Sequence, residues 1–587
     1  MNFALQRALW ASQYRMVAWR AHSTAAIPES SRYSRMLLPT KKQADNNGGG
    51  TQTTTDLLTK AGYIKQSSAG IFTLMPLAQR VMDKIEKIVD EEMRSVGGQK
   101  LAMPNLLGPE HWRKSGRWAT AGDEVFRLKD RRGSTLLLGP THEEEITALI
   151  KDTVRGFREY PLRMYQITRK FRDEARPRAG LLRGREFVMK DMYTFDVTQK
   201  QAIDTFDQLE AAYRRVFDRI GVEYKVADAD SGSIGGSLSK EFHFTNDVGE
   251  DTVLECRACG RVANEERARS RVLGPSQVFL ATAGTSDGVK AEGGQRRLVV
   301  VPADHEPSAL KIAHAWGLAS TQTLAFEPVA DGALSTMEHA QLLPPMVDQC
   351  CTEISSDSFA GAMAGDWHVA RAGDGCGQCS GGTLEATRAI EVGHIFYLGD
   401  RYSRAMGLTV LHQGQREPVQ MGCFGIGVSR VLQAAAECTS NSKDSTGGSI
   451  RWPPAIAPFL ATILPLTEAG EAGVTRVSEI LGRVNVRGRP VFHDNVAVDD
   501  RAYLSPGFRL NDAQLLGIPV TVVLGRGFEK ELPEVEVQLR VPGLHLTGHV
   551  AGTSVEARGA SVYRAHVPLD SLELFLAEAL GADTIAL

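Results

Sequence analysis

The chain has 587 residues, which is enough for three to four domains with sizeable cores. Its 67 basic and 70 acidic residues leave a net charge of −3, which excludes binding of nucleic acid through a strongly basic charge on the whole molecule. No apolar run approaches the roughly 20 residues that span a bilayer, so the sequence predicts a soluble protein without a membrane span.

The first 40 residues differ in composition from the rest of the chain. Their arginines are Arg7, Arg15, Arg20, Arg32 and Arg35, against the single acidic residue Glu29. An Arg-rich, acid-poor segment with interspersed apolar residues is typical of a mitochondrial transit peptide, and it lacks the apolar core of a secretory signal. The alternative is a disordered tail with no targeting role. We expect a transit peptide over residues 1–40 and a location in the mitochondrial matrix.

A helix is expected to begin near residue 141. Thr141 and Glu144 have the spacing of a capping box, and Ile146 and Ile150 follow with helical periodicity. The same turn offers the Thr141 hydroxyl and the Glu143 carboxylate, which are suited to receive an ammonium group. The two interpretations are compatible because a capped turn is rigid.

An antiparallel hairpin is expected around a basic loop. Residues 167–174 have the character of a strand, residues 175–180 are too rich in Arg, Pro and Gly to continue it, and the chain returns through 183–187. In a strand, Arg172 and Glu174 point the same way. The arginine can bind a phosphate and a carboxylate at once, and the glutamate can accept a hydrogen bond from an adenine amine.

Phe187 and Arg430 are suited to bind the two faces of an adenine ring. Phe187 would stack on one face, and Arg430 would close the other by a cation–π contact. Arg430 ends the segment Gly-Cys-Phe-Gly-Ile-Gly-Val-Ser-Arg at 422–430. This segment is not a dinucleotide-binding fingerprint, since arginine replaces the third glycine, and the chain has no P-loop. A basic patch with few acidic partners is expected around the hairpin: Arg163, Arg169, Lys170, Arg172, Arg176, Arg178, Arg183 and Arg185.

Two Cys-x-x-Cys pairs bracket a segment of more than 100 residues. The pairs are Cys256 with Cys259 and Cys376 with Cys379. Four thiolates in two such turns can hold a tetrahedral zinc ion and fasten the exit of the segment to its return. Four reduced thiols without a metal are an equally good interpretation, and a disulfide framework is not expected.

The C-terminal part is expected to be an α/β sandwich that begins near residue 455. Strand-like runs at 461–464 and 520–524 alternate with helical runs at 474–483 and 507–516. This alternation predicts a largely parallel sheet covered by helices.

The hairpin and the segment 422–430 together resemble motifs 2 and 3 of the class II aminoacyl-tRNA synthetases. Further stretches are similar to bacterial-type prolyl-tRNA synthetases: 141–144, 171–174, 183–187, 233–237, 390–396, 421–427, 452–453, 457–459 and 505–512. The resemblance covers residues 67–539, with a weak patch in the middle. It implies an α/β (α+β) fold with an antiparallel-sheet catalytic domain, split into 56–250 and 380–450. It also implies an inserted editing-like domain at 251–379 and an α/β anticodon-binding domain at 455–587.

The resemblance implies a proline–tRNA ligase that uses ATP and Mg²⁺, acts on L-proline and tRNA(Pro), and forms a homodimer, as motif 1-like residues ending at Pro104 suggest. Proline would be bound by Thr141, Glu143, Arg172, His394, Phe396 and Cys423. ATP would be bound by Arg172, Glu174, Arg183, Gly184, Phe187, Glu391 and Arg430. Arg172 and Arg430 are the expected catalytic residues, because charge neutralisation and positioning carry the first step.

Two further sets of residues follow from the resemblance. Asp500, Arg501, Phe508 and Arg509 are candidates for contacting anticodon bases, with an ordinary helix-start turn as the alternative. Lys311 and His368 are similar to editing residues. However, the insertion is shorter than in the family and lacks its Gly-x-x-x-Pro loop, so we expect little or no editing.

Two other classes of protein remain as alternatives. A non-catalytic scaffold of class II fold would have lost the ATP-binding residues, whereas Arg172, Glu174, Phe187 and Arg430 are all present. A threonine or serine synthetase is the other alternative. The threonine enzyme would need a His/Cys zinc site in its pocket, which Cys423 alone does not supply.

Overall fold

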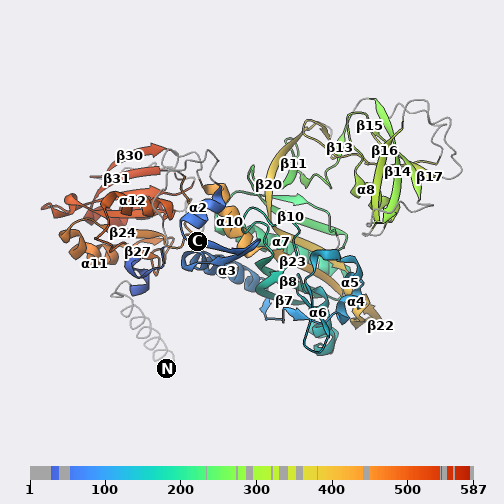
Figure 1. Cartoon of the computed structure of the whole chain (residues 1–587), viewed down its shortest axis with the longest axis horizontal. Coiled ribbons are helices and arrows are strands. Elements are labelled where there is room, and N and C mark those ends of the chain that lie inside the picture. Colours follow the sequence, from blue (N-terminus) through green and yellow to red (C-terminus); the bar gives the residue numbers. More distant parts are fainter. Residues whose placement is uncertain are drawn as a thin grey trace, which may run out of the picture.

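Three bodies follow one another along the molecule: a C-terminal domain at one end, a central domain, and an inserted domain at the other end (Figure 1). The computed structural model describes residues 28–38, 53–232, 234–272, 275–285, 295–318, 322–329, 342–351, 361–379, 381–440, 448–542, 544, 552–559 and 562–581. Among these residues, no helix combines the length and apolar character needed to cross a membrane.

The central domain is built on a nine-stranded sheet in the order β10-β9-β12-β11-β20-β23-β8-β7-β3. Its strands are β3 (Gln99–Lys100), β7 (Leu162–Phe171), β8 (Glu186–Asp196), β9 (Tyr224–Asp228), β10 (Leu238–Thr245), β11 (Asp251–Cys256), β12 (Val262–Asn264), β20 (Leu384–Gly399) and β23 (Gln420–Ile426). All neighbouring pairs are antiparallel except β3–β7 and β9–β12. The expected antiparallel sheet, split between two stretches of sequence, is confirmed.

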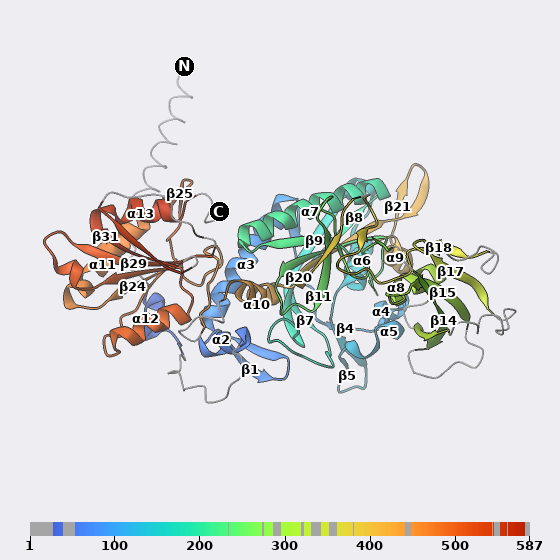
Figure 2. The same ribbon diagram turned by 90° about the horizontal axis from the view of Figure 1, so that it is seen from above.

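Three long helices pack along one side of this sheet: α3 (Pro76–Ser95), α7 (Gln199–Ile220) and α10 (Val428–Thr439) (Figure 2). In α7, buried apolar residues recur every three or four positions, among them Phe206, Tyr213 and Phe217. A capping box between Thr198 and Gln201 starts the helix. These helices and the sheet form the largest core of the molecule.

Smaller elements close the other parts of the central domain. The helices are α2 (Thr54–Lys60), α4 (Glu110–Ser115), α5 (Arg117–Thr120), α6 (Glu143–Thr153), α9 (Arg401–Met406) and the 3₁₀ turns η3 (Gly122–Glu124) and η4 (Phe157–Glu159). The strands are β1 (Ile64–Ser68), β2 (Ile71–Leu74), β4 (Leu106–Leu107), β5 (Arg127–Lys129), β6 (Thr135–Leu138), β21 (Thr409–His412) and β22 (Gln415–Pro418). Helices α4, α5, α6 and α9 pack against one another.

The inserted domain is a five-stranded sheet in the order β16-β14-β15-β17-β18, with helix α8 (Ala309–Trp316) beside it. The strands are β14 (Ser276–Thr285), β15 (Arg296–Pro302), β16 (Gln322–Pro328), β17 (Leu343–Asp348) and β18 (Met363–Gly365), with β13 (Ser270–Arg271) and β19 (Gly375–Cys376) paired at its base. The expected boundary at residue 251 is too early. Strands β11 and β12 pair within the central sheet, so the insertion begins after them.

The C-terminal domain holds a six-stranded sheet in the order β27-β24-β28-β29-β31-β30. Its strands are β24 (Ala461–Pro465), β27 (Val496–Val498), β28 (Val520–Leu524), β29 (Glu534–Arg540), β30 (Ser554–Gly559) and β31 (Val562–Pro568), beside the small pair β25 (Asn485–Val486) and β26 (Arg489–Pro490). Its helices are α11 (Glu468–Arg483), α12 (Pro506–Leu515), α13 (Leu572–Ala579), η8 (Arg526–Glu529) and η9 (Leu569–Ser571). The sheet is mixed rather than largely parallel, because β28–β29, β29–β31 and β30–β31 are antiparallel.

An N-terminal strap, residues 28–38 with turns η1 (Glu29–Ser31) and η2 (Tyr33–Arg35), lies on the edge of this C-terminal sheet. Arg32 forms a parallel bridge with Val498 of β27. The Tyr33 side chain is only 2% exposed and joins the main core. The expected transit peptide over 1–40 therefore overlaps a folded element, because burial of Tyr33 ties the strap to the globular part; residues 1–27 lie outside the described residues.

Candidate active site

A cavity of about 330 Å³ opens where the β7–β8 hairpin, β20, β23 and the starts of α6 and α10 meet. All twelve residues expected to bind proline or ATP line it: Thr141, Glu143, Arg172, Glu174, Arg183, Gly184, Phe187, Glu391, His394, Phe396, Cys423 and Arg430. They come from segments up to 289 positions apart (141 to 430) and are brought together by the sheet order β20-β23-β8-β7. The cavity has the size of a small-molecule site.

At one end of the cavity, Glu143 presents a fully buried carboxylate. The Thr141 hydroxyl donates to it at 2.7 and 2.8 Å, and the Cys423 thiol donates at 3.3 Å. Burial alone would raise the pKa of Glu143, but the Arg117 guanidinium and these donors hold it below its usual value. The carboxylate is therefore ready to receive a cation.

The expected capping box at this turn is wrong. Helix α6 begins at Glu143 with His142 as its N-cap, and no side chain caps it. The Thr141 hydroxyl is bonded to the Glu143 carboxylate instead, and Glu144 pairs with Arg117. Short-range spacing predicted the helix start but not the ion pair of Glu144, whose partner Arg117 lies 27 residues earlier.

Arg172 reaches the middle of the cavity from the first position after β7. The strand ends at Phe171, three residues earlier than the expected strand, although Arg172 N still bonds to Arg185 O at 3.0 Å. The guanidinium lies 5.4 Å from the centre of the Phe187 ring and forms no ion pair with any described carboxylate. Burial and the neighbouring Arg430 lower its pKa, and the nearby carboxylates of Glu391, Glu124 and Glu174 offset this only in part.

The basic hairpin has more acidic partners than expected. Arg183 pairs with Glu174 at 2.8 Å and with Glu250 at 3.2 Å. The remaining pairs are Arg169 with Glu186, Lys170 with Asp191, Arg178 with Glu250 and Arg185 with Asp173. Five of the eight basic residues of the patch are thus held in ion pairs with five carboxylates, four of which belong to the hairpin itself.

Glu391, His394 and Arg430 form a second polar cluster on the cavity wall. Arg430 donates to the Glu391 carbonyl at 3.0 Å and to its carboxylate at 3.1 Å, and also to Leu182 O at 2.9 Å. His394 contacts Glu391 at 3.1 Å and stacks on Phe396 with ring centres 3.8 Å apart. Burial would raise the pKa of Glu391, but His394 and Arg430 lower it strongly, so this carboxylate is ionised.

Several residues of the site were not found from the sequence. Asp191 and Glu241 line the cavity, and Arg117 lies behind Glu143. Asp191 pairs with Lys170 at 2.9 Å, and both are buried. One signal was available: β8 places charged residues 190 and 191 inside an otherwise apolar run, which is rare without a function or a partner.

Comparison with known proteins agrees with this geometry. The family model of the tRNA synthetase class II core domain (G, H, P, S and T) matches residues 126–439. The proline–tRNA ligase of Trichlorobacter lovleyi is 35% identical over 560 residues, covering 87% of this chain and 94% of that protein. The proline–tRNA ligase of Anaeromyxobacter sp. (strain Fw109-5) is 36% identical over 91% of this chain and 99% of its own length.

The chain belongs to the prolyl-tRNA synthetase family.

Solved structures support the fold of this class II synthetase. Prolyl-tRNA synthetase from Cryptosporidium parvum complexed with halofuginone and AMPPNP has a TM-score of 0.56 and 14% identity, covering 91% of this chain and 78% of its own. The same enzyme complexed with L-proline and AMP has a TM-score of 0.55, with the same identity and coverage.

The four cysteines at the base of the insertion come together in this synthetase. Cys256 Sγ lies 3.6 Å from Cys379 Sγ, Cys259 Sγ lies 4.0 Å from Cys376 Sγ, and all four sulfur atoms lie within 4.8 Å of one another. Thiolates at the corners of a zinc tetrahedron with bonds of about 2.3 Å are about 3.8 Å apart. The backbone N–H of Gln378 also donates to Cys376 Sγ at 3.3 Å.

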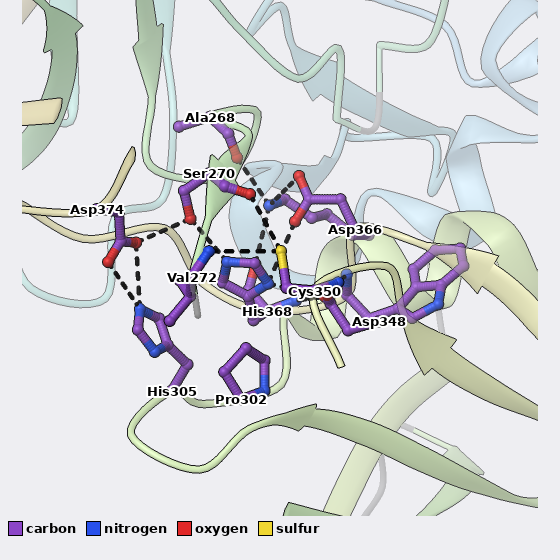
Figure 3. Close-up of polar contacts among 12 residues, drawn as sticks. Ala268, Ser270, Val272, Pro302, His305, Asp348, Cys350, Asp366, His368 and Asp374 are labelled. Atoms are coloured by element: carbon purple, nitrogen blue, oxygen red, sulfur yellow. Dashed lines mark hydrogen bonds and ion pairs between the residues drawn. The ribbon is translucent and has the colours of Figure 1, made fainter. Parts of the chain in front are cut away.

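His368, one of the two editing-like residues, lies in a buried polar junction (Figure 3), and the other, Lys311, bonds to the same part of the chain. His368 bonds through Nδ1 to Asp348 and through Nε2 to Ser270, both at 2.7 Å. This is the order of a Ser–His–Asp triad, but the Ser270 hydroxyl also donates to Asp374 at 2.8 Å, and Ser270, His368 and Asp348 are each at most 1% exposed. These three residues therefore have a structural role and do not form a catalytic triad.

Lys311 completes this junction. Its ammonium donates to Ala268 O at 2.8 Å, to His368 O at 2.9 Å and to the Asp366 carboxylate at 3.2 Å. All three donors of the ammonium are therefore engaged within the protein. The side chain connects α8 to the chain on both sides of the insertion.

Two of the four predicted anticodon-contacting side chains are buried. Arg501 binds Asp499 at 2.8 and 2.9 Å and Asp512 at 2.8 Å, and Arg509 binds the carbonyl of Asp499. Arg501 and Arg509 are 5% and 3% exposed, so the prediction that they contact bases is not supported.

The other two candidates are more accessible. Asp500 accepts two hydrogen bonds from Ser34 of the N-terminal strap. Phe508 stays partly exposed on α12, while the nearby Tyr503 ring is 80% exposed.

Proposed function

We propose that this protein activates L-proline with ATP to prolyl-adenylate and then transfers the prolyl group to the 3′ end of tRNA(Pro). The observation that carries the proposal is the placement of Glu143 and Arg172 in one cavity. The first is a buried anion suited to an ammonium, and the second is a cation suited to a carboxylate. The relatives named as proline–tRNA ligases support proline as the amino acid.

At the proline end, the secondary ammonium carries two N–H donors. Glu143 and the Thr141 hydroxyl oxygen supply two acceptors, and the stacked rings of His394 and Phe396 shape the apolar wall. Arg172 would hold the carboxylate and the α-phosphate together, so that the carboxylate attacks the phosphorus and pyrophosphate leaves. No protein nucleophile or general base is needed, since developing charge is met by fixed cations.

At the ATP end, the adenine ring would stack on Phe187 and be recognised by Glu174, with Arg183 and Arg430 near the phosphates. Mg²⁺ fits here because the Glu241 and Glu391 carboxylates line the same cavity, and hard cations prefer oxygen ligands. The ion would neutralise the phosphates.

The deciding experiment is ATP–pyrophosphate exchange, measured separately with each of the twenty amino acids. We expect exchange with proline that exceeds the signal from any other amino acid by about 100-fold. Strong exchange with threonine or serine and none with proline would contradict the proposal. No exchange with any amino acid would favour a non-catalytic scaffold.

The proposal extends to tRNA(Pro), which the names of the relatives support, and to a homodimer, which the motif 1-like residues ending at Pro104 support. Tyr503 and Phe508 are the aromatic side chains of the C-terminal domain suited to stack on unpaired bases. Tyr503→Ala should raise the KM for tRNA(Pro) and leave proline-dependent exchange unchanged. Light scattering at micromolar concentration measures the oligomeric state.

We also propose import into the mitochondrial matrix, with the targeting segment shortened to residues 1–27. The support is the three arginines and the absence of acidic residues in that stretch. A reporter fused to residues 1–27 should enter mitochondria, and the variant with Arg7, Arg15 and Arg20 changed to glutamine should not. A parent fusion that stays in the cytosol would contradict the import proposal.

The proposal also includes a zinc ion, held by Cys256, Cys259, Cys376 and Cys379. The sulfur spacing fits a zinc tetrahedron, and the backbone at Gly382 leaves no room for a side chain, because a Cβ there would lie 2.2 Å from Cys256 Sγ. The purified protein should contain about one zinc per chain. Cys376→Ser should lose it, whereas the matched control Cys438→Ser, outside the cluster, should retain it.

A further inference from the structure

Arg117 lies behind the cavity at the start of α5 and makes no direct contact with the space that substrate would occupy. It is 7% exposed, and its Nη1 atom lies 2.9 Å from Glu143 Oε2 and 3.2 Å from Glu144 Oε2. The guanidinium packs over the Trp112 ring at 4.6 Å. One cation therefore serves two buried carboxylates on adjacent residues of α6.

We propose that Arg117 is a positioning residue for amino-acid binding. Arg117, Glu143 and Glu144 form a buried charge set with one positive and two negative groups, and the ammonium of the substrate supplies the second positive charge. This inference rests on the proposed function. It adds a residue that contacts no substrate but sets the charge and orientation of the group that does.

The surroundings do not supply the missing cation. Glu144 accepts a hydrogen bond from Ser115 at 2.7 Å, and Glu143 accepts from Thr141 and Cys423, all of them neutral donors. The other ionisable groups packed against the set are Tyr402 on α9, His142, Asp191 with its partner Lys170, Lys190 and Tyr193. Asp191 and Lys170 neutralise each other, and burial lowers the pKa of His142. Burial also lowers the pKa of Lys190 to about 7, and its amine bonds to the Tyr213 hydroxyl and to Phe424 O rather than to either glutamate.

The two carboxylates, those of Glu143 and Glu144, differ in the direction in which their pKa values are shifted. Burial raises the pKa of Glu144, and the adjacent Glu143 raises it further, so Glu144 is the weaker acid of the pair. Glu143 stays below its usual pKa, despite burial, because Arg117, Thr141 and Cys423 stabilise its charge. The negative charge is thus directed to the carboxylate that faces the cavity, which is the one that meets the ammonium.

The test compares proline-dependent exchange kinetics of the parent, Arg117→Met and Arg117→Lys. We expect Arg117→Met to lower kcat/KM for proline about 100-fold with the KM for ATP changed less than about 2-fold, since a buried charge loses its partner. Arg117→Lys, which keeps the charge, should recover most of the loss. Arg113→Met is the matched control, because Arg113 is exposed on the neighbouring helix α4.

A pH profile distinguishes this role from simple support of the fold. Removing a cation beside buried carboxylates raises their pKa, so the acidic limb of kcat/KM for proline should move to higher pH in Arg117→Met by about one unit or more. The limb should not move in Arg113→Met. An unmoved limb in Arg117→Met, or a kcat/KM within about 3-fold of the parent, would overturn the inference.

A second-site variant keeps the test informative if Arg117→Met does not fold. The double variant Arg117→Met with Glu144→Gln removes one charge of each sign and restores the net charge of the set. It should regain at least about 10-fold in kcat/KM over Arg117→Met, or fold where the single variant does not. A double variant no better than the single one contradicts the charge argument. If the parent proves to use another amino acid, the same variants are measured with that one, because every amino acid carries the ammonium.

Discussion

At the residue scale, the basic side chains in and near the cavity are of two kinds: those that pair with carboxylates of the protein and one that does not. Arg183, Arg185 and Lys170 are engaged in ion pairs with carboxylates of the protein, whereas Arg172 has no such pair among the described residues. An unpaired, largely enclosed guanidinium costs free energy in the empty site and regains it when an anion arrives. The contrast identifies Arg172 as the residue whose partner is the substrate.

Arg172→Lys should therefore reduce proline-dependent pyrophosphate exchange by about 100-fold or more, because an ammonium cannot bind carboxylate and phosphate in the forked geometry of arginine. Arg169→Lys is the matched control. Its side chain lies on β7, just before Arg172, is 67% exposed and pairs with Glu186. Near-normal exchange in Arg172→Lys would show that this residue does not hold the reacting anions.

Asp196 provides a stability prediction with a defined pH dependence. It is 1% exposed, and burial raises its pKa from 3.8 to about 6 despite a hydrogen bond from Thr205. Between pH 4 and 6 the folded carboxyl keeps a proton that the unfolded chain has lost, so stability falls as pH rises through this window. Asp196→Asn should remove the effect and raise stability above pH 7 by up to about 3 kcal/mol.

Thermal unfolding of the parent and Asp196→Asn at pH 4.5 and pH 7.5 measures this. The difference in Tm should be small at the lower pH and largest at the higher one. Equal differences at both values would mean that Asp196 is ionised in the folded protein throughout.

At the element scale, the sequence predicted the regular parts of the molecule well. The β7–β8 hairpin, the strands near residues 461 and 520 and the helices near 474 and 507 lie where hydrophobic periodicity and turn residues indicated. The twelve residues expected to bind proline or ATP do line one cavity, because the resemblance supplied an arrangement that no local pattern contains, and their binding roles stay predictions. Arg117 was missed, since its role depends on a partner in another helix.

The errors share a physical cause. The capping box expected at Thr141, the parallel sheet expected in the C-terminal domain and the base contacts expected of Arg501 were all decided by contacts between distant segments. Tertiary ion pairs and strand order are not encoded in local spacing. Charged residues near a helix start are usually exposed, and only the structure shows that Asp499 and Asp512 enclose Arg501.

The inserted domain leads to a prediction about editing. We expect the purified protein to deacylate alanyl-tRNA(Pro) at a rate close to that of the uncatalysed reaction, because Lys311 and His368 are engaged in the junction of Figure 3. Lys311→Met should lower the Tm by several degrees and leave proline-dependent exchange unchanged. The control is His314→Ala, an exposed position on the same helix. Rapid deacylation that disappears in Lys311→Met would show a functional editing site.

At the scale of the whole molecule, the two ends of the described chain meet in one domain. The strap formed by residues 28–38 lies against β27, and Arg501 packs over its Tyr33 ring at 5.1 Å. The edge of the C-terminal sheet is therefore covered by a segment from the opposite end of the sequence. Its removal would expose the core that the main cluster shares with the C-terminal domain.

Deletion of residues 1–27 should leave the Tm unchanged, whereas deletion of residues 1–38 should lower it by several degrees, because a buried aromatic side chain is lost at a cost of about 3–5 kcal/mol. Tyr33→Ala should reproduce most of the larger effect, and Arg35→Ala, 69% exposed in the same strap, should not. Equal stability of the two deletions would show that the strap contributes nothing to the fold.

The strap also sets an order of events during synthesis. Ser34 and its partner Asp500 are 466 positions apart, so the strap leaves the ribosome long before the edge that receives it has been made. The strap therefore stays unattached until residue 500 has been made, and its attachment marks a chain that has reached the C-terminal domain. In a product truncated before residue 500, Tyr33 would stay exposed to proteases and chaperones. Incomplete chains would therefore differ from complete ones in the strap near their N-terminus.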